Sequence, residues 1–163
     1  MFYKTRAPLF EVRDSGIHGR GAFALCRIRK GTTIIEYTGE RISSTEGDRR
    51  YRMNGERHHH TFLFSVNDEI CIDARRRGNA ARFINHSCNP NCQAVDDDGR
   101  IFIEAIGTIE PGTELTYDYN MFGVTPRTRN EKSLYACYCG APDCRGTMLR
   151  PSPAASRNLR NRN

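Results

Sequence analysis

The stretch RFINHSCNPNC, residues 82–92, places an Asn-His-Ser turn directly before one cysteine and a second cysteine four positions later. Another thiol cluster, CYCGAPDC, residues 137–144, begins 45 residues further along the chain. Its three thiols within eight residues would supply three of the four ligands that a tetrahedral structural zinc takes. Cys88 and Cys92 are both candidates for the fourth ligand, and spacing alone does not separate them. The sequence therefore predicts one zinc ion that joins the two segments.

Cysteine usage and hydropathy predict a soluble, intracellular protein. The seven cysteines are an odd number, and the N-terminus lacks the apolar segment of a secretion signal, which argues against a disulfide framework. No apolar run approaches the ~20 residues that a membrane helix needs, so no membrane partner is expected. Cys26 and Cys71 lie in apolar, strand-like runs and are predicted to be buried structural thiols.

The net charge of +6 does not indicate a nucleic-acid binder. The tail from Arg150 carries four arginines and no acidic residue, and the rest of the chain then has 21 basic and 19 acidic residues. Phosphate-binding surfaces need clustered cations, so direct nucleic-acid binding is not expected as the main role. The tail, residues 150–163, is rich in Pro, Ser, Asn and Arg, and is predicted to be disordered.

Short apolar runs separated by turn residues predict a mostly β domain. The runs are LFEV, GAFALCRI, TTIIEYTG, TFLFSV, EICIDA, RIFIEAI and ELTYDY. One helix is predicted after Ser43, which forms a capping-box pattern with Glu46. A second, short helix is predicted over 78–84, and residues 120–136 are predicted to form a loop.

Five motifs occur in an order that resembles a known family. They are GIHGRGAFA (16–24), EYTGE (36–40), GNAARFINHSCNPNC (78–92), GTELTYDY (112–119) and CYCGAPDCRG (137–146). Together they resemble the SET-domain protein-lysine methyltransferases of the trithorax/mixed-lineage-leukaemia class, over residues 10 to 148. The resemblance implies small curved β-sheets with a C-terminal pseudoknot. It also implies a SET domain at 8–120 and a post-SET zinc-binding segment at 133–149.

The resemblance also implies a cofactor site and a zinc site. Asn85 and His86 match the family's pair that binds the methyl donor S-adenosylmethionine. Further expected contacts come from the glycine-containing turn, from a position where some relatives have tyrosine, and from within the cysteine cluster; they are His18, Arg20, Phe62 and Tyr138. Cys88 matches the fourth ligand of one structural zinc, beside Cys137, Cys139 and Cys144.

The family's catalytic tyrosines have counterparts here as well. A lysine amine titrates near ~10.4 in water and must lose its proton before it can accept a methyl group. A water-poor aromatic channel lowers the amine pKa by desolvation and aligns the reacting atoms. Tyr37, Tyr117 and Tyr119 match the residues of such a channel, with Tyr119 at the transfer centre. Because position 117 is tyrosine, we expect mainly monomethylation, with some dimethylation possible.

The sequence does not name the substrate. The resemblance implies lysines of a basic protein, such as a histone tail or a bacterial nucleoid protein, and activating protein subunits as further partners. The expected location is chromatin in a eukaryotic nucleus, or the cytoplasm and nucleoid of a bacterium. The alternative to an enzyme is a catalytically weak, zinc-stabilised peptide-binding module.

Overall fold

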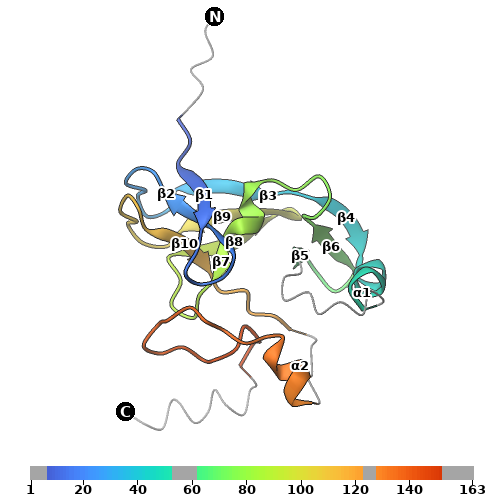
Figure 1. Ribbon diagram of the computed structural model, residues 1–163. Helices are drawn as coiled ribbons and strands as arrows, with labels where there is room; N and C mark the ends of the chain where they lie inside the picture. The colour runs from blue at the N-terminus through green and yellow to red at the C-terminus, as the bar shows by residue number, and fades with distance from the viewer. Residues whose placement is uncertain (1–6, 53–61, 123–127, 152–163) are drawn as a thin grey trace, which may run out of the picture.

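The computed structural model describes residues 7–52, 62–122 and 128–151, and these are mostly β-structure, which confirms the predicted fold class. Figure 1 shows two sheets side by side. The larger contains β1 (Phe10–Asp14), β2 (Arg20–Ala24), β3 (Thr33–Tyr37), β7 (Asn85–His86), β8 (Cys92–Asp97), β9 (Arg100–Ala105) and β10 (Glu114–Tyr117). The smaller contains β4 (Glu40–Ser43), β5 (Leu63–Ser65) and β6 (Ile70–Asp73).

The larger sheet is built on alternating apolar residues and tight turns. In β9 the side chains of Ile101, Ile103 and Ala105 are buried and alternate with more exposed neighbours, as one face of a strand requires. The β8–β9 hairpin turns at Asp98 and Gly99, both with positive φ, which is the backbone of a type I′ turn. The largest fully buried side chains of the core are Ile28, Ile84, Ile103, Ile109, Leu115 and Cys92.

A parallel pairing in the larger sheet brings two motifs together. The strand order is β1-β2-β10-β8-β9-β3, and the short β7 pairs with β10 in parallel. In this register Thr116 lies opposite Asn85, and Tyr117 lies opposite His86. The NHSC turn and the YDY stretch are therefore neighbours, although about 30 residues separate them in sequence.

The helical predictions are confirmed in part. Helix α1 (Ser44–Arg52) follows Ser43, whose Oγ accepts the backbone N–H of Glu46 at 3.1 Å. The second predicted helix forms as a 3-10 helix, η1 (Ala80–Phe83). The loop predicted for 120–136 was wrong in one place, because α2 (Arg129–Ser133) lies within it. The predicted disorder of the tail concerns mainly residues 152–163, which lie outside the described residues.

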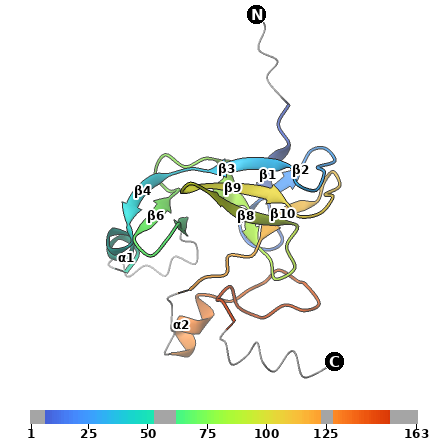
Figure 2. The same ribbon diagram turned by 180° about the vertical axis from the view of Figure 1, so that it is seen from behind.

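The C-terminal segment, residues 128–151, lies to one side of the sheets, as both views show (Figures 1 and 2). It folds back on itself through an Ala136–Thr147 bridge, and a parallel bridge joins Leu149 to Met121. No residue of the segment whose burial is described is fully buried. In the part of the chain that the structure covers, no helix has the length and apolar character needed to cross a membrane.

Candidate functional site

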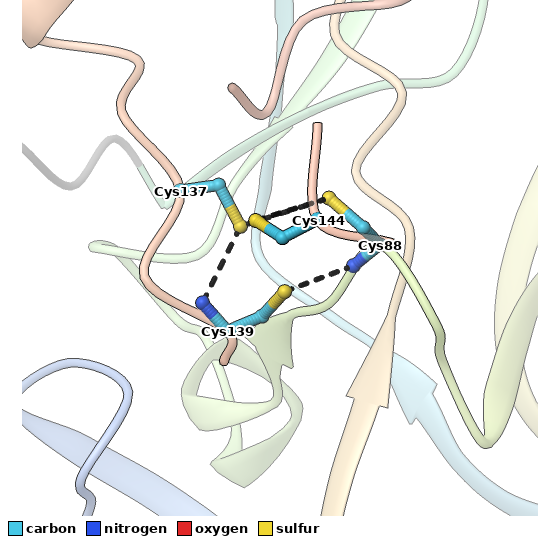
Figure 3. Close-up of side chains that lie close together, drawn as sticks. All are labelled: Cys88, Cys137, Cys139 and Cys144. Atoms are coloured by element: carbon cyan, nitrogen blue, oxygen red, sulfur yellow. Dashed lines mark hydrogen bonds between the residues drawn. The ribbon is translucent and has the colours of Figure 1, made fainter. Parts of the chain in front are cut away.

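Four cysteines gather where the C-terminal segment meets the NHSC turn (Figure 3). The Sγ atoms of Cys88, Cys137, Cys139 and Cys144 all lie within 4.8 Å of one another. The Cys88 sulfur is 3.7 Å from that of Cys137 and 3.9 Å from that of Cys144. Sulfurs bound at ~2.3 Å to one tetrahedral zinc would lie about 3.8 Å apart. The cluster therefore has the ligand type and the dimensions of a structural zinc site.

Backbone N–H groups surround the sulfurs. Cys88 N–H donates to Cys139 Sγ at 3.5 Å, and Cys139 N–H donates to Cys137 Sγ at 3.4 Å (Figure 3). The N–H groups of Arg145 and Gly146 donate to Cys88 Sγ and Cys144 Sγ, each at 3.4 Å. Such donors stabilise the negative charge of thiolate ligands and fix their orientation. The four thiols are thus held together with N–H donors directed at them, an arrangement that could hold a metal ion.

Cys92, the other candidate for the fourth ligand, lies apart from the cluster. It is buried on β8, and its Sγ donates to Asn91 Oδ1 at 3.4 Å. Burial raises the pKa of this thiol to about 12, which favours a neutral core side chain. The structure brings Cys88, and not Cys92, to the other three thiols.

The two remaining cysteines differ in their burial. The prediction for Cys71 is confirmed, since it is 3 % exposed on β6. The prediction for Cys26 was wrong, because this thiol is exposed. Strand β2 ends at Ala24, so Cys26 falls beyond the apolar alternation that suggested its burial.

A cavity of about 360 Å³ lies between the NHSC turn and the C-terminal segment. This volume is within the ~300–1,000 Å³ of typical small-molecule sites. One wall comes from the N-terminal turn and the sheet, and the opposite wall comes from the segment that carries the cysteines. The lining residues are Ile17, His18, Asn85, His86, Tyr119, Ser133, Leu134, Ala136, Cys137, Tyr138 and Met148.

A carboxylate fixes Asn85 at the edge of this cavity. The Asn85 Nδ2 lies 2.8 Å from Glu114 Oε1, and Ser15 Oγ donates to the same oxygen at 2.7 Å. The backbone oxygens of His18 and Arg20 lie 3.2 and 3.1 Å from Nδ2. A Cβ added at Gly21 would collide with the Glu114 carboxylate and displace the group that holds Asn85. The glycine turn is therefore shaped around Asn85.

His86 connects the cavity to the cysteine cluster. Its Nδ1 accepts the backbone N–H of Tyr119 at 3.1 Å, so the neutral ring carries its proton on Nε2. That nitrogen lies 3.5 Å from Cys88 Sγ. Burial lowers the pKa of His86 to about 4, against the opposing effect of the Asp118 carboxylate. The ring is therefore neutral at physiological pH.

Four aromatic rings form a chain beside the cavity. The ring centroids of Tyr119 and Tyr117 lie 4.8 Å apart, and Phe64 lies 6.3 Å from Tyr117 and 5.3 Å from Tyr37. The Tyr119 hydroxyl donates to Ile84 O at 3.0 Å. Burial, with a smaller effect of Glu114, raises the pKa of Tyr119 well above its usual value. This phenol is therefore protonated at neutral pH.

The predicted residues divide into two groups. Five of the predicted cofactor-binding and catalytic residues line the cavity together: His18, Asn85, His86, Tyr119 and Tyr138, the last being 69 % exposed. The others lie next to that group. Arg20 stacks its guanidinium over the Phe83 ring at 4.9 Å, and the backbone oxygen of Phe62 accepts the Tyr37 hydroxyl at 3.2 Å. Tyr117 does not line the cavity, but its ring contacts that of Tyr119, which does.

Sequence reasoning missed several contributors. Phe64 joins the aromatic chain, Glu114 holds Asn85, and Leu134 and Met148 supply apolar wall. The ion pair between Asp118 and Arg145 also went unseen. Its one sequence signal is that each member sits inside a motif, in YDY and in CRG. Strand alternation alone would not have located any of these contacts.

Comparison with known proteins agrees with this geometry. Residues 19–120 match the SET domain family. Trithorax, a histone-lysine N-methyltransferase of Drosophila virilis, is 44% identical over 147 residues, which are 88% of this chain and 4% of that protein. The H3 lysine-4 specific histone-lysine N-methyltransferase of Saccharomyces cerevisiae is 40% identical over 152 residues, 89% of this chain and 13% of that protein.

The name of a third relative states how many methyl groups it adds. The histone H3-lysine(4) N-trimethyltransferase ATX1 of Arabidopsis thaliana is 41% identical over 140 residues, 82% of this chain and 12% of that protein. The chain thus spans only 4% to 13% of the length of these three relatives. It belongs to the SET-domain family, and its similarity to trithorax and to H3 lysine-4 specific methyltransferases confirms the class that the motifs indicated.

Proposed function

We propose that this chain is an S-adenosylmethionine-dependent protein-lysine N-methyltransferase. The observation that carries the proposal is that Tyr119 lines the same cavity as Asn85 and His86. Residues 8–120 would form the SET domain, residues 133–149 the post-SET segment, and residues 150–163 a disordered basic tail. One structural zinc would be held by Cys88, Cys137, Cys139 and Cys144.

The cavity suits the cofactor in shape and polarity. When bound, S-adenosylmethionine supplies a methyl group on a positively charged sulfonium. Asn85 and His86 offer fixed polar groups at one side, because Glu114 and the Tyr119 N–H hold their side chains in place. His18 and Tyr138 also line the cavity, and Leu134 and Met148 give it apolar wall. Binding at this site would place the methyl group near Tyr119.

The aromatic chain prepares the substrate amine. Tyr117, Phe64 and Tyr37 continue from Tyr119 as a series of ring contacts, and desolvation beside these rings would lower the pKa of a lysine amine. The Tyr119 proton is committed to Ile84 O, which leaves the hydroxyl oxygen free to accept an N–H of the amine. Since the phenol stays protonated, Tyr119 orients the amine and does not remove its proton. The amine is expected to lose that proton to water as it enters the channel, where desolvation lowers its pKa.

Histone H3 is the substrate we favour, since two of the relatives are named for its lysine 4. The protein would then act on chromatin in a nucleus, with partner subunits that raise its activity. The proposed product is mainly monomethyl-lysine, because the buried Tyr117 ring packs at 4.8 Å from Tyr119 and restricts space there. The name of the Arabidopsis relative shows that the class includes a trimethyltransferase, so the product needs its own test.

The test is methyl transfer from labelled S-adenosylmethionine to a panel of proteins. Histone H3, the other core histones and a bacterial nucleoid protein should be compared, with Tyr119→Phe as the inactive control. Label in H3 that depends on Tyr119 supports the proposal. Binding of H3 peptides without transfer of label, in zinc-loaded protein, would instead favour a peptide-binding module.

A further inference from the structure

Two residues 27 positions apart, Asp118 and Arg145, form a two-point ion pair between the end of β10 and the C-terminal segment. Arg145 Nη1 donates to Asp118 Oδ2 at 2.9 Å, and Nη2 donates to Oδ1 at 2.8 Å. Asp118 follows β10, and Arg145 directly follows Cys144 in the C-terminal segment. Both side chains are partly buried, with 31 % and 25 % exposed. Paired hydrogen bonds of this kind fix direction as well as distance.

Each member also contacts a functional group of the site. Asp118 Oδ1 lies 3.5 Å from His86 Nδ1. The same oxygen accepts the backbone N–H of Asn120, the residue after Tyr119, at 2.9 Å. Arg145 donates its own backbone N–H to Cys88 Sγ at 3.4 Å. A set of contacts therefore runs from the cysteine cluster through Arg145 and Asp118 to the backbone N–H of Asn120, the residue after Tyr119, and the Asp118 carboxylate also lies beside the neutral His86 ring.

The pair is charged and is costly to break. Burial alone would raise the pKa of Asp118, but the Arg145 and Asn120 hydrogen bonds outweigh it and hold the pKa below the usual value. The Nε of Arg145 is buried and has no hydrogen-bond partner within the described structure. Most of what stabilises this guanidinium therefore comes from Asp118, and removing either partner leaves a partly buried charge unpaired.

We propose that Asp118 and Arg145 are positioning residues that hold the zinc-binding segment against the SET core, so that both walls of the cavity keep their spacing. This inference rests on the proposed function for its effect on catalysis. Its effects on cofactor binding and on zinc retention do not depend on methyl transfer. Contacts around a metal ligand commonly change metal affinity or activity by about 10- to 100-fold when removed.

The experiment compares Asp118→Asn, Arg145→Met and the double variant with the control Arg100→Met. The control removes a similar two-point pair, Arg100 to Glu36 at 2.6 and 3.0 Å, which lies between β9 and β3. Full-length, zinc-loaded proteins are measured for the Kd of S-adenosylmethionine by calorimetry, for KM and kcat, and for the rate of zinc release to a chelator. Loss of folded protein alone would lower the apparent kcat and leave KM unchanged.

We expect Asp118→Asn and Arg145→Met to raise both the Kd and the KM for S-adenosylmethionine by about tenfold or more and to accelerate zinc release. For Arg100→Met, the Kd, the KM and the rate of zinc release should stay within about twofold of wild type. The double variant should bind S-adenosylmethionine no more weakly than either single variant, because the two single variants and the double variant all break the same contact. If Arg145→Met does not fold, the nearly isosteric Asp118→Asn decides the question.

A Kd and a zinc-release rate for Asp118→Asn within about twofold of the control would overturn the inference. If the wild-type protein binds S-adenosylmethionine but transfers no methyl group, the proposed function fails, while the Kd comparison still decides the role of the pair. If it does not bind S-adenosylmethionine either, the zinc-release rates decide it.

Discussion

The sheet region and the C-terminal segment are stabilised in different ways. Every fully buried apolar side chain among the described residues belongs to residues 22–117, where Ile28, Ile103 and Leu115 are almost without exposed surface. Residues 128–151 have no described side chain of this kind. Among the described residues, their contacts with the rest of the chain include the four-cysteine cluster, the Asp118–Arg145 pair and short backbone bridges. Apolar burial folds the first region, whereas the cysteine cluster and an ion pair attach the second.

This difference has a functional meaning, because the cavity lies between the two regions. A wall that is attached without a core of its own can come loose while the rest stays folded. The site that we assign to the cofactor would then be assembled only when the metal is bound. Such coupling of metal binding to local folding is usual for small zinc segments.

Removing the proposed zinc should have the largest effect, because it would release the C-terminal segment from the sheet region. Cys88→Ser should take the zinc content from one per chain to zero and lower methyl transfer by roughly 100-fold or more, since one cavity wall loses its position. The sheets should stay folded, because their core does not include the cluster. Elemental analysis, activity and circular dichroism measured together check this outcome.

Cys92→Ser is the matched control for that experiment. Cys92 is 1 % exposed within the core, so serine places a hydroxyl among apolar side chains and should lower the free energy of unfolding by about 1–3 kcal/mol. Zinc content should remain at one per chain. Zinc lost from the Cys92 variant and kept in the Cys88 variant would show that the ligand assignment is wrong.

The second prediction concerns Tyr119, which lines the cavity from the side of the sheet region. Tyr119→Phe keeps the ring that packs on Tyr117 and His86 but removes the hydroxyl. Methyl transfer should fall by roughly 100-fold or more, while the Kd for S-adenosylmethionine changes little. Tyr37→Phe, which loses the bond to Phe62 O away from the cavity, is the control and should lose less activity. Wild-type turnover in Tyr119→Phe would remove this tyrosine from the mechanism.

The third prediction concerns Tyr117→Phe, which should change the methylation product and leave the rate of the first transfer nearly unaltered. A second methylation requires the methylated amine to rotate and store its first methyl group beside Tyr117. The Tyr117 ring is buried and lies between Phe64 and Tyr119, so Tyr117→Phe keeps the packing and frees the volume of one hydroxyl. Products should shift from mono- towards di- and trimethyl-lysine, with the first step slowed less than about threefold. Mass spectrometry of a peptide over time measures this, and trimethyl-lysine as the main wild-type product would refute it.

The residues of the site could be predicted from the sequence more fully than the path and pairing of the strands. Motif order identified Asn85, His86 and Tyr119, and the structure brings all three to one cavity. Spacing could not separate Cys88 from Cys92, because both lie near the turn and only the path of β8 carries Cys92 into the core. The parallel pairing of β7 with β10 could not be predicted either, because a two-residue strand such as β7 is too short to show an alternation of apolar and polar residues.

The contacts of charged residues were the hardest to predict. Asp118 and Arg145 meet only because the C-terminal segment folds back, and a carboxylate in a strand motif gives no sign of its partner. Helix α2 was missed for a related reason. RNEKS is polar and short, and such a segment shows no apolar face from which a helix could be predicted.

Helix α1 is an exception within the sheet region, because charge also holds it. Its nine residues include one aromatic and no aliphatic side chain. Arg50 donates to Glu46, to Glu40 and to the buried Asp73, at 2.7 to 2.9 Å. Tyr51 adds a hydrogen bond to the same aspartate. This helix therefore resembles the C-terminal segment more than it resembles the core that it lies beside.

The last and smallest predicted effect tests that resemblance through pH. Hydrogen bonds from Arg49 and Arg50 hold the pKa of Glu46 at about 2, below its ordinary 4.5. A lowered folded-state pKa adds stability that is complete above about pH 4.5 and is lost as the pH falls towards about 2. The urea midpoint of wild type should therefore exceed that of Glu46→Gln at pH 6, and the difference should shrink steadily between pH 4.5 and pH 2. Glu110→Gln, which removes an exposed ion pair with Arg27, should show a smaller difference at pH 6. A gap between wild type and Glu46→Gln that does not change with pH would mean that α1 is held by packing and not by its charges.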